Sequence, residues 1–235
     1  MCSSDLLAIA GAAGNGQVEL AETIIGLRNM KSGDILLEGK SIKNENIEKR
    51  SMLGIGYIPE DRHRFGIVPD MSIAENLVLN CISQPPFSQK GIINHKQIKD
   101  NSDKAIVDFT IKTEDGFTPI KNLSGGNQQK VILAKTLMDN SKLIVACNPT
   151  RGLDFSATDY LRKKLVESAC NDDVGILLYS SDLDELLELA DRILVIYQGK
   201  VMGIINRSEV DMEKLGMMMA GFSYEGQKQA NALDN

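Results

Sequence analysis

The pattern that decides the fold is the stretch Leu6-Leu-Ala-Ile-Ala-Gly-Ala-Ala-Gly-Asn-Gly-Gln-Val-Glu-Leu-Ala-Glu-Thr-Ile-Ile25. Its apolar run is typical of a buried strand in a parallel sheet. Glycines follow that run, and the apolar residues after them have helical spacing. A signal peptide fits poorly, because no basic segment precedes the apolar run, which is only about six residues long. The stretch therefore predicts a strand, a glycine loop and a helix.

The same alternation of strands and helices continues along the chain. It predicts a mostly parallel sheet with helices on both faces, which is an α/β fold. Residues 66–122 differ because no strand is evident there, and Ser72 with Glu75 is typical of a capped helix start. Pro85-Pro86 is expected to end that helix. The remaining elements are expected as strands at 34–39, 53–58, 143–147, 174–179, 192–197 and 200–205, and as helices at 19–25, 98–109, 130–138, 156–168 and 183–190.

This pattern of predicted strands and helices divides the chain into four parts. Residues 1–65 are expected to form the first part of the α/β core, and residues 66–122 an inserted helical subdomain. Residues 123–223 are expected to complete the core. Residues 224–235 are polar and are predicted to be a flexible tail.

Composition excludes several classes of protein. The 235 residues include 43% hydrophobic and 25% charged residues, as in ordinary globular proteins. Lysine and arginine number 26 against 32 acidic residues, a net charge of −6, so nucleic-acid binding through phosphate neutralisation is not expected. Four widely separated cysteines are predicted to be reduced thiols, and two histidines make a histidine-based metal site improbable. We therefore expect no metal site in this chain.

The loop of Gly11, Gly14, Asn15 and Gly16 has the glycine frame of a phosphate-binding loop, in which backbone N–H groups face an anion. The full pattern continues with lysine and then serine or threonine. Here Gln17 and Val18 stand at those positions, so the residues that would neutralise phosphates and hold Mg²⁺ are missing. A plain turn between strand and helix remains an alternative interpretation.

The strongest signal is Leu123-Ser-Gly-Gly-Asn-Gln-Gln-Lys130. Ser124 suits a helix N-cap, and Gly125 and Gly126 allow a ligand to approach the backbone closely. The helix dipole then favours a phosphate in front of the helix. A simple capped helix would not need two glycines followed by three amides.

These eight residues resemble the signature motif of ABC-transporter ATPases, in the form found in the second nucleotide-binding domain of sugar and nucleoside importers. The resemblance runs from about Leu7 to Phe222 and implies a P-loop NTPase core. The segment 54–62 is similar to the family's Q-loop region, with Glu60 where many relatives have glutamine. Residues 148–154 resemble the end of the Walker B strand and the D-loop, and residues 180–185 resemble the switch region.

Three departures from the family pattern add to those at Gln17 and Val18. Cys147 and Asn148 replace the two carboxylates that end a Walker B strand, and Ser181 replaces the switch histidine. Neither Cys147 nor Asn148 can act as a carboxylate base. We therefore expect no catalytic residue in this chain's own site and no ATPase activity from the isolated chain.

In this family, two nucleotide-binding domains pair head to tail around ATP. The resemblance implies that the signature closes on ATP held by a partner domain. That partner would also supply most of the Mg²⁺ ligands. Asp154 would lie at the interface between the two domains. Glu60 and residues 62–71 would face an integral-membrane permease subunit, although residues 61–64 could also be a solvated loop. The protein would then lie peripherally on the cytoplasmic face of the plasma membrane. The residues expected to contact the partner's ATP are Ser124, Gly125, Gly126, Asn127 and Gln128.

Relatives also have antiparallel strands and an adenine-stacking aromatic residue before the glycine loop, and neither is evident in residues 1–10. The chain is therefore expected to lack the start of its domain. Two other functions remain open. One is a non-catalytic interaction or regulatory module that pairs with an ATPase or a membrane subunit, and the other is an independent P-loop enzyme such as a kinase or GTPase. The motifs do not separate sugars from nucleosides as the transported solute.

Overall fold

The computed structural model describes residues 5–138, 141–171 and 174–222. Its centre is a six-stranded sheet with the strand order β10-β9-β1-β8-β7-β4. Neighbouring strands run parallel except β9 and β10, which are antiparallel. The expected mostly parallel sheet is thus confirmed. Its strands are β1 (Leu6–Ala10), β4 (Ile55–Ile58), β7 (Leu143–Cys147), β8 (Gly175–Tyr179), β9 (Arg192–Tyr197) and β10 (Lys200–Asn206).

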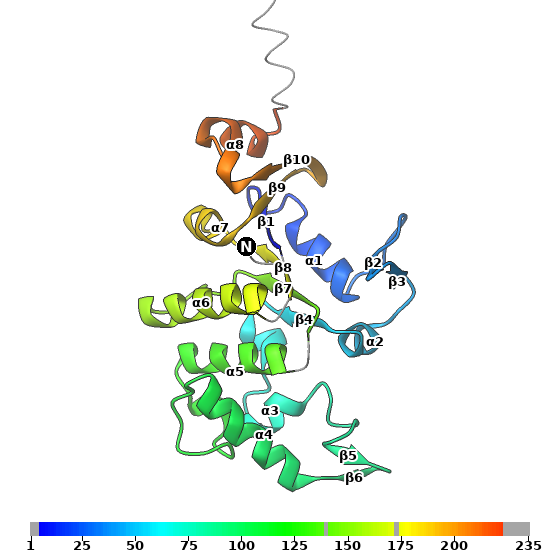
Figure 1. Ribbon diagram of the computed structural model, residues 1–235, viewed down its shortest axis with the longest axis vertical. Helices are drawn as coiled ribbons and strands as arrows, with labels where there is room; N and C mark the ends of the chain where they lie inside the picture. The colour runs from blue at the N-terminus through cyan, green and yellow to red at the C-terminus, as the bar shows by residue number, and fades with distance from the viewer. Residues whose placement is uncertain (1–4, 139–140, 172–173, 223–235) are drawn as a thin grey trace, which may run out of the picture.

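Helices cover both faces of this sheet (Figure 1). Successive side chains of a strand point to opposite faces, and β7 demonstrates this directly. Ile144 and Ala146 belong to the large apolar cluster, whereas Val145 and Cys147 belong to the smaller one. The smaller cluster includes residues of α1 (Gln17–Ile25), and α2 (Ile47–Met52) follows on the same side. The large cluster includes residues of α5 (Gly125–Met138), α6 (Phe155–Asn171), α7 (Leu183–Leu189) and α8 (Met212–Met219).

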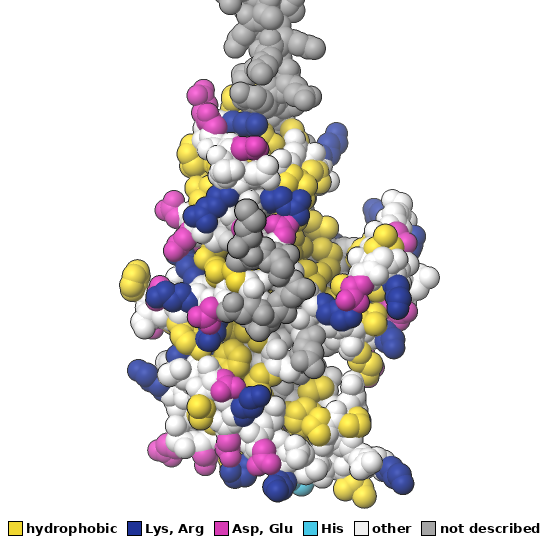
Figure 2. Space-filling model, viewed as in Figure 1, with side chains coloured by type: hydrophobic (Ala, Val, Ile, Leu, Met, Phe, Trp, Pro, Cys, Tyr) yellow, Lys and Arg dark blue, Asp and Glu magenta, His cyan; other side chains and the backbone are white. Residues whose placement is uncertain are grey.

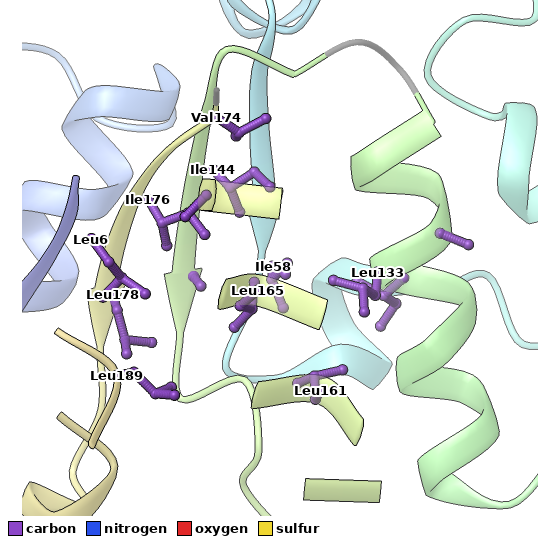
Figure 3. Packing of buried hydrophobic residues seen from close by; sticks show 14 of the residues in the cluster. Leu6, Ile58, Leu133, Ile144, Leu161, Leu165, Val174, Ile176, Leu178 and Leu189 are labelled. Atoms are coloured by element: carbon purple, nitrogen blue, oxygen red, sulfur yellow. The ribbon is translucent and has the colours of Figure 1, made fainter. Parts of the chain in front are cut away.

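The large cluster holds the sheet against α5 and α6 (Figure 3). Ile144 and Ile176 project from the sheet toward Leu165 of α6, with Leu133 of α5 beyond. All four side chains are buried. Burying a side chain of this size contributes about 1.5–3 kcal/mol to stability. This packing fixes α5, and with it the signature residues at its start.

Two short hairpins correct the expected secondary structure. A strand was predicted over 34–39, but Glu38 and Gly39 have positive φ and join β2 (Leu36–Leu37) to β3 (Lys40–Ser41). Residues 66–122 were predicted without strands, yet Lys90 and Gly91 join β5 (Ser88–Gln89) to β6 (Ile92–Ile93). In both cases, a residue followed by glycine forms the two-residue turn, a signal that the sequence contains.

The α-helices between β4 and α5 are α3 (Ile73–Val78) and α4 (His95–Asp108). A short π-helix (Arg62–Gly66) precedes them, and a 3-10 turn (Ile120–Asn122) follows. The capping box expected at Ser72 is confirmed, because Glu75 N–H donates to Ser72 Oγ (3.2 Å) and Ser72 N–H donates to Glu75 Oε2 (2.8 Å). The helix ends at Val78, well before Pro85, so the expectation that the two prolines end it is wrong. The division into subdomains stays a prediction, and the tail 224–235 lies outside the described residues.

Charges are intermixed on the surface. On the face drawn in Figure 2, lysine and arginine side chains lie among aspartates and glutamates rather than in one basic stripe. None of the helices in the described ranges combines the length and apolar character needed to cross a bilayer. Cys170 is disulfide-bonded, so the prediction of four reduced thiols is wrong for Cys170.

Candidate functional site

The glycine loop joins β1 to α1, as predicted, and its interior is filled by the side chain of Gln17. This side chain is only 1% exposed. Its Oε1 accepts a hydrogen bond from Asn15 N–H (3.1 Å), and its Nε2 donates to the Ala12 carbonyl (3.0 Å). A backbone N–H that could face an anion is therefore already bonded within the loop.

Asn15 ties the loop to the turn between β9 and β10. Its Nδ2 donates to the Ala12 carbonyl (2.9 Å), and its Oδ1 accepts from Gln198 N–H (2.8 Å). Its backbone carbonyl accepts from Gly199 N–H (2.8 Å). Val18 follows with its apolar side chain 37% exposed, where a metal-binding hydroxyl would be needed. The loop thus offers neither a cation at residue 17 nor an oxygen ligand at residue 18.

Cys147 is the last residue of β7, and Asn148 follows it beside this loop. The register pairs Ile9 of β1 and Cys147 of β7 with the same residue of β8, Tyr179, so the carboxyl ends of these strands meet. Asn148 adopts φ 44°, and its Oδ1 accepts from Ser181 N–H (2.7 Å) and Ser181 Oγ (3.0 Å). Burial raises the pKa of the Cys147 thiol to about 12. These three side chains are therefore neutral near pH 7.

Glu60 follows β4 and forms an ion pair with Arg151, in the turn after β7. Arg62 reaches the same turn and donates to the Arg151 carbonyl (3.4 Å). A Cβ on Gly125 would lie 2.8 Å from Arg62 Nη2, so the guanidinium packs directly against the start of α5. The structure thus brings the segment after β4 to the signature helix of the same chain.

The signature residues are organised around Ser124, which directly precedes α5. Ser124 O accepts from Gln128 N–H (2.9 Å), and Ser124 Oγ accepts from Asn127 Nδ2 (3.0 Å). Asn127 Oδ1 in turn accepts from Lys112 N–H (2.9 Å). A Cβ on Gly126 would lie 3.0 Å from Ala157 Cβ, so this glycine also permits α6 to approach α5.

Gln128 occupies a different position from its neighbours. It is buried, and its Nε2 donates to the carbonyls of Ile120 (3.3 Å) and Leu123 (3.2 Å). The amide holds the turn ahead of α5. Of the five residues expected to contact the partner's ATP, Ser124, Gly126 and Asn127 line an open cleft.

A cleft of about 270 Å³ lies in front of these three residues. It brings them together with Asp154, whose Oδ1 accepts from Ala157 N–H (2.9 Å). Sequence reasoning missed Lys112, Lys130 and Tyr160 in this cleft. Lys130 could have been predicted, because it is the last residue of the signature motif. No local sequence signal pointed to Lys112 or Tyr160. The complete lining is Lys112, Ser124, Gly126, Asn127, Lys130, Asp154, Ser156, Ala157 and Tyr160.

Apart from Glu60, which pairs with Arg151, the predicted site residues therefore fall into two groups. One group lies at the carboxyl ends of β1, β7 and β8 and consists of the glycine loop with Cys147, Asn148 and Ser181. The other consists of the signature residues and Asp154. Within the described ranges, no group of three or more histidine, cysteine, aspartate or glutamate side chains could hold a metal ion.

Known proteins resemble this chain in sequence and in fold. A family model described as ABC transporter matches residues 2–151. The chain is 39% identical to the guanosine import ATP-binding protein NupO of Bacillus subtilis (strain 168), over 97% of this chain and 45% of that protein. It is 37% identical to the ribose import ATP-binding protein RbsA of Bacillus licheniformis, over 93% of this chain and 44% of that protein. The chain thus spans less than half the length of these relatives.

Comparison with solved structures agrees with these sequence matches. The dimeric structure of a post-hydrolysis state of the ATP-binding cassette MJ0796, bound to ADP and Pi, superposes with a TM-score of 0.73 at 19% identity. The match covers 86% of this chain and 85% of that one. The fold is thus that of a P-loop NTPase cassette, and the chain belongs to the ABC transporter family.

Proposed function

We propose that this chain is an ATP-binding module of an importer for nucleosides or simple sugars. Its signature residues would complete an ATP site held mainly by a partner nucleotide-binding domain. Two relatives support the solute class, since one is named as a guanosine import protein and the other as a ribose import protein. The two solutes share a ribose unit, which leaves the choice between a free sugar and a nucleoside open.

The observation that carries this proposal is the contrast between the two groups of site residues. ABC-transporter ATPases use ATP with Mg²⁺, but the chain's own glycine loop does not fit that pair. Gln17 fills the loop, Val18 cannot bind a metal ion, and Asn148 cannot act as a base. ATP and Mg²⁺ would therefore be held by the partner, which would also supply the catalytic groups.

The signature cleft, by contrast, is open at the start of a 14-residue helix. Ser124 and the first N–H groups of α5 would face a phosphate of the partner's ATP, where the helix dipole favours negative charge. Asp154, on the same cleft, would lie at the seam between the two domains. The chain alone would then be inactive and would contribute to ATP hydrolysis only within the pair.

A second surface suits the membrane subunit. A groove of about 210 Å³ lies between the α1–α2 region and the segment after β4, and its lining includes Leu27, Ile47 and Phe65. These three side chains are 48%, 46% and 53% exposed, which is unusual for apolar residues grouped in one place. We propose that an integral-membrane permease subunit binds here and along residues 62–71. The module would then lie peripherally at the cytoplasmic face of the membrane.

Calorimetry tests the proposal. Mg·ATP is titrated into the chain alone, and then into the chain mixed with a catalytically intact nucleotide-binding domain. We expect no binding by the chain alone and ATP-dependent association of the pair. Tight Mg·ATP binding by the isolated chain would overturn the assignment of a degenerate site. Association that is independent of ATP would favour the alternative of a non-catalytic interaction module.

A further inference from the structure

Two lysines line the signature cleft without an acidic partner. Neither Lys112 nor Lys130 forms an ion pair within the described part of the chain. Lys130 is fixed in place, since its Nζ donates to the Thr110 carbonyl (2.9 Å) and lies 4.3 Å from the centroid of the Tyr160 ring. Lys112 is exposed, and its backbone is bound to the signature through Asn127.

The charges of the cleft do not balance. Two ammonium groups and one carboxylate, that of Asp154, line it. The pKa of Lys130 is lowered first by burial and then by the charge of Lys112, while Asp154 acts in the opposite direction. The two cations therefore repel each other beside the positive end of the α5 dipole, and an anion between them would relieve that repulsion.

We propose that Lys112 and Lys130 bind phosphate groups of the nucleoside triphosphate that the partner presents to Ser124. The inference rests on the proposed function and adds two cationic ligands to the signature site. Asn127 is the positioning residue, because its side chain joins the Lys112 segment to Ser124 Oγ. Both lysines lie on the cleft that Ser124 and Gly126 border, so one bound polyphosphate could contact all of them.

Lys112→Ala is the principal test, because the side chain is exposed and its loss should leave the fold intact. A charge-assisted hydrogen bond to phosphate is among the strong ones, so we expect the ATP concentration for half-maximal pairing with an intact partner domain to rise roughly tenfold. Pairing should recover at saturating ATP, and Lys112→Arg should retain most of the affinity. Lys163→Ala is the matched control, because Lys163 lies on α6, outside the cleft, and pairs with Asp159.

Three outcomes separate this inference from the proposed function. If wild type pairs with ATP and Ser124→Arg prevents pairing, while Lys112→Ala behaves like Lys163→Ala, the lysine inference fails and the proposed function stands. If Lys112→Ala weakens pairing equally at every ATP concentration, the lysine contacts the partner protein and the phosphate assignment fails. If wild type itself does not pair with ATP, the proposed function fails, and this inference fails with it.

Lys130 needs a second measurement, because its contacts with Thr110 and Tyr160 give it a structural role as well. We expect ATP in the paired complex to protect both Lys112 and Lys130 from acylation, detected by mass spectrometry of wild-type protein. Lys163 should react equally with and without ATP. Equal acylation of all three lysines in both conditions would overturn the proposal without requiring any variant to fold.

Discussion

The glycine loop before α1 and the signature segment at the start of α5 have similar local sequences but different local structures. Each is rich in glycine and leads into a helix N-terminus, where an anion is favoured. In the first, the Gln17 amide is turned back into the loop and bonds Asn15 N–H and the Ala12 carbonyl. In the second, Ser124 and Gly126 border a cleft of about 270 Å³. The two glycine-rich segments thus differ in whether a side chain occupies the space in front of the helix.

The largest expected effect distinguishes the two regions directly. In an assembled transporter, Ser124→Arg should reduce ATPase activity to background, because the bulky cation would fill the cleft. Gln17→Ala should change the activity less than about twofold, because that site is expected not to turn over ATP. The measurement is phosphate release by both variants at saturating Mg·ATP. Equal losses would show that the two regions are not functionally different.

The next effect concerns the support of the turn after β7. Glu185 is fully buried, and its Oε1 accepts from Thr150 Oγ1 (2.8 Å) and Arg162 Nε (3.2 Å). We expect Glu185→Ala to lower the free energy of unfolding by about 2–3 kcal/mol, because Arg162 keeps only its contacts to Asp182 and Glu188.

Glu185→Gln is the matched variant, since it retains an oxygen acceptor of the same size and should cost less than about 1.5 kcal/mol. Urea denaturation of the isolated chain measures the loss of unfolding free energy in both variants. Similar losses from the two variants would mean that the charge, rather than the hydrogen bonds to the turn, stabilises this region.

The smallest expected effect comes from restoring phosphate-binding residues to the glycine loop, which would make it more similar to a functional ATP site. The double variant Gln17→Lys with Val18→Thr frees Asn15 N–H, adds a cation and supplies a hydroxyl for Mg²⁺. We expect the isolated double variant to bind Mg·ATP detectably in calorimetry, whereas the wild-type chain is expected to show no binding. Gln17→Lys alone should gain less affinity for ATP, and that affinity should depend less on Mg²⁺. If neither variant gains affinity, something other than residues 17 and 18 closes the loop.

Much of the fold followed from local pattern. β1 and β7 match the predicted strands, because apolar runs of that length are buried on both faces of a parallel sheet. The two hairpins were missed because strands of two residues carry almost no periodicity. Their turns were nonetheless readable at Glu38-Gly39 and Lys90-Gly91.

The sequence by itself determined which residue types stand at the phosphate loop, at the end of β7 and in the signature, because these motifs are short and contiguous. It also determined that Gln17 carries no charge. Only the tertiary structure decided that the Gln17 amide fills its loop, and that Lys112 and Tyr160 reach the cleft of Ser124. The Gln17 contacts lie within one loop and depend on its backbone conformation. Lys112 and Tyr160 belong to segments that packing brings to the cleft, and the local pattern of one segment carries no information about its neighbours in space.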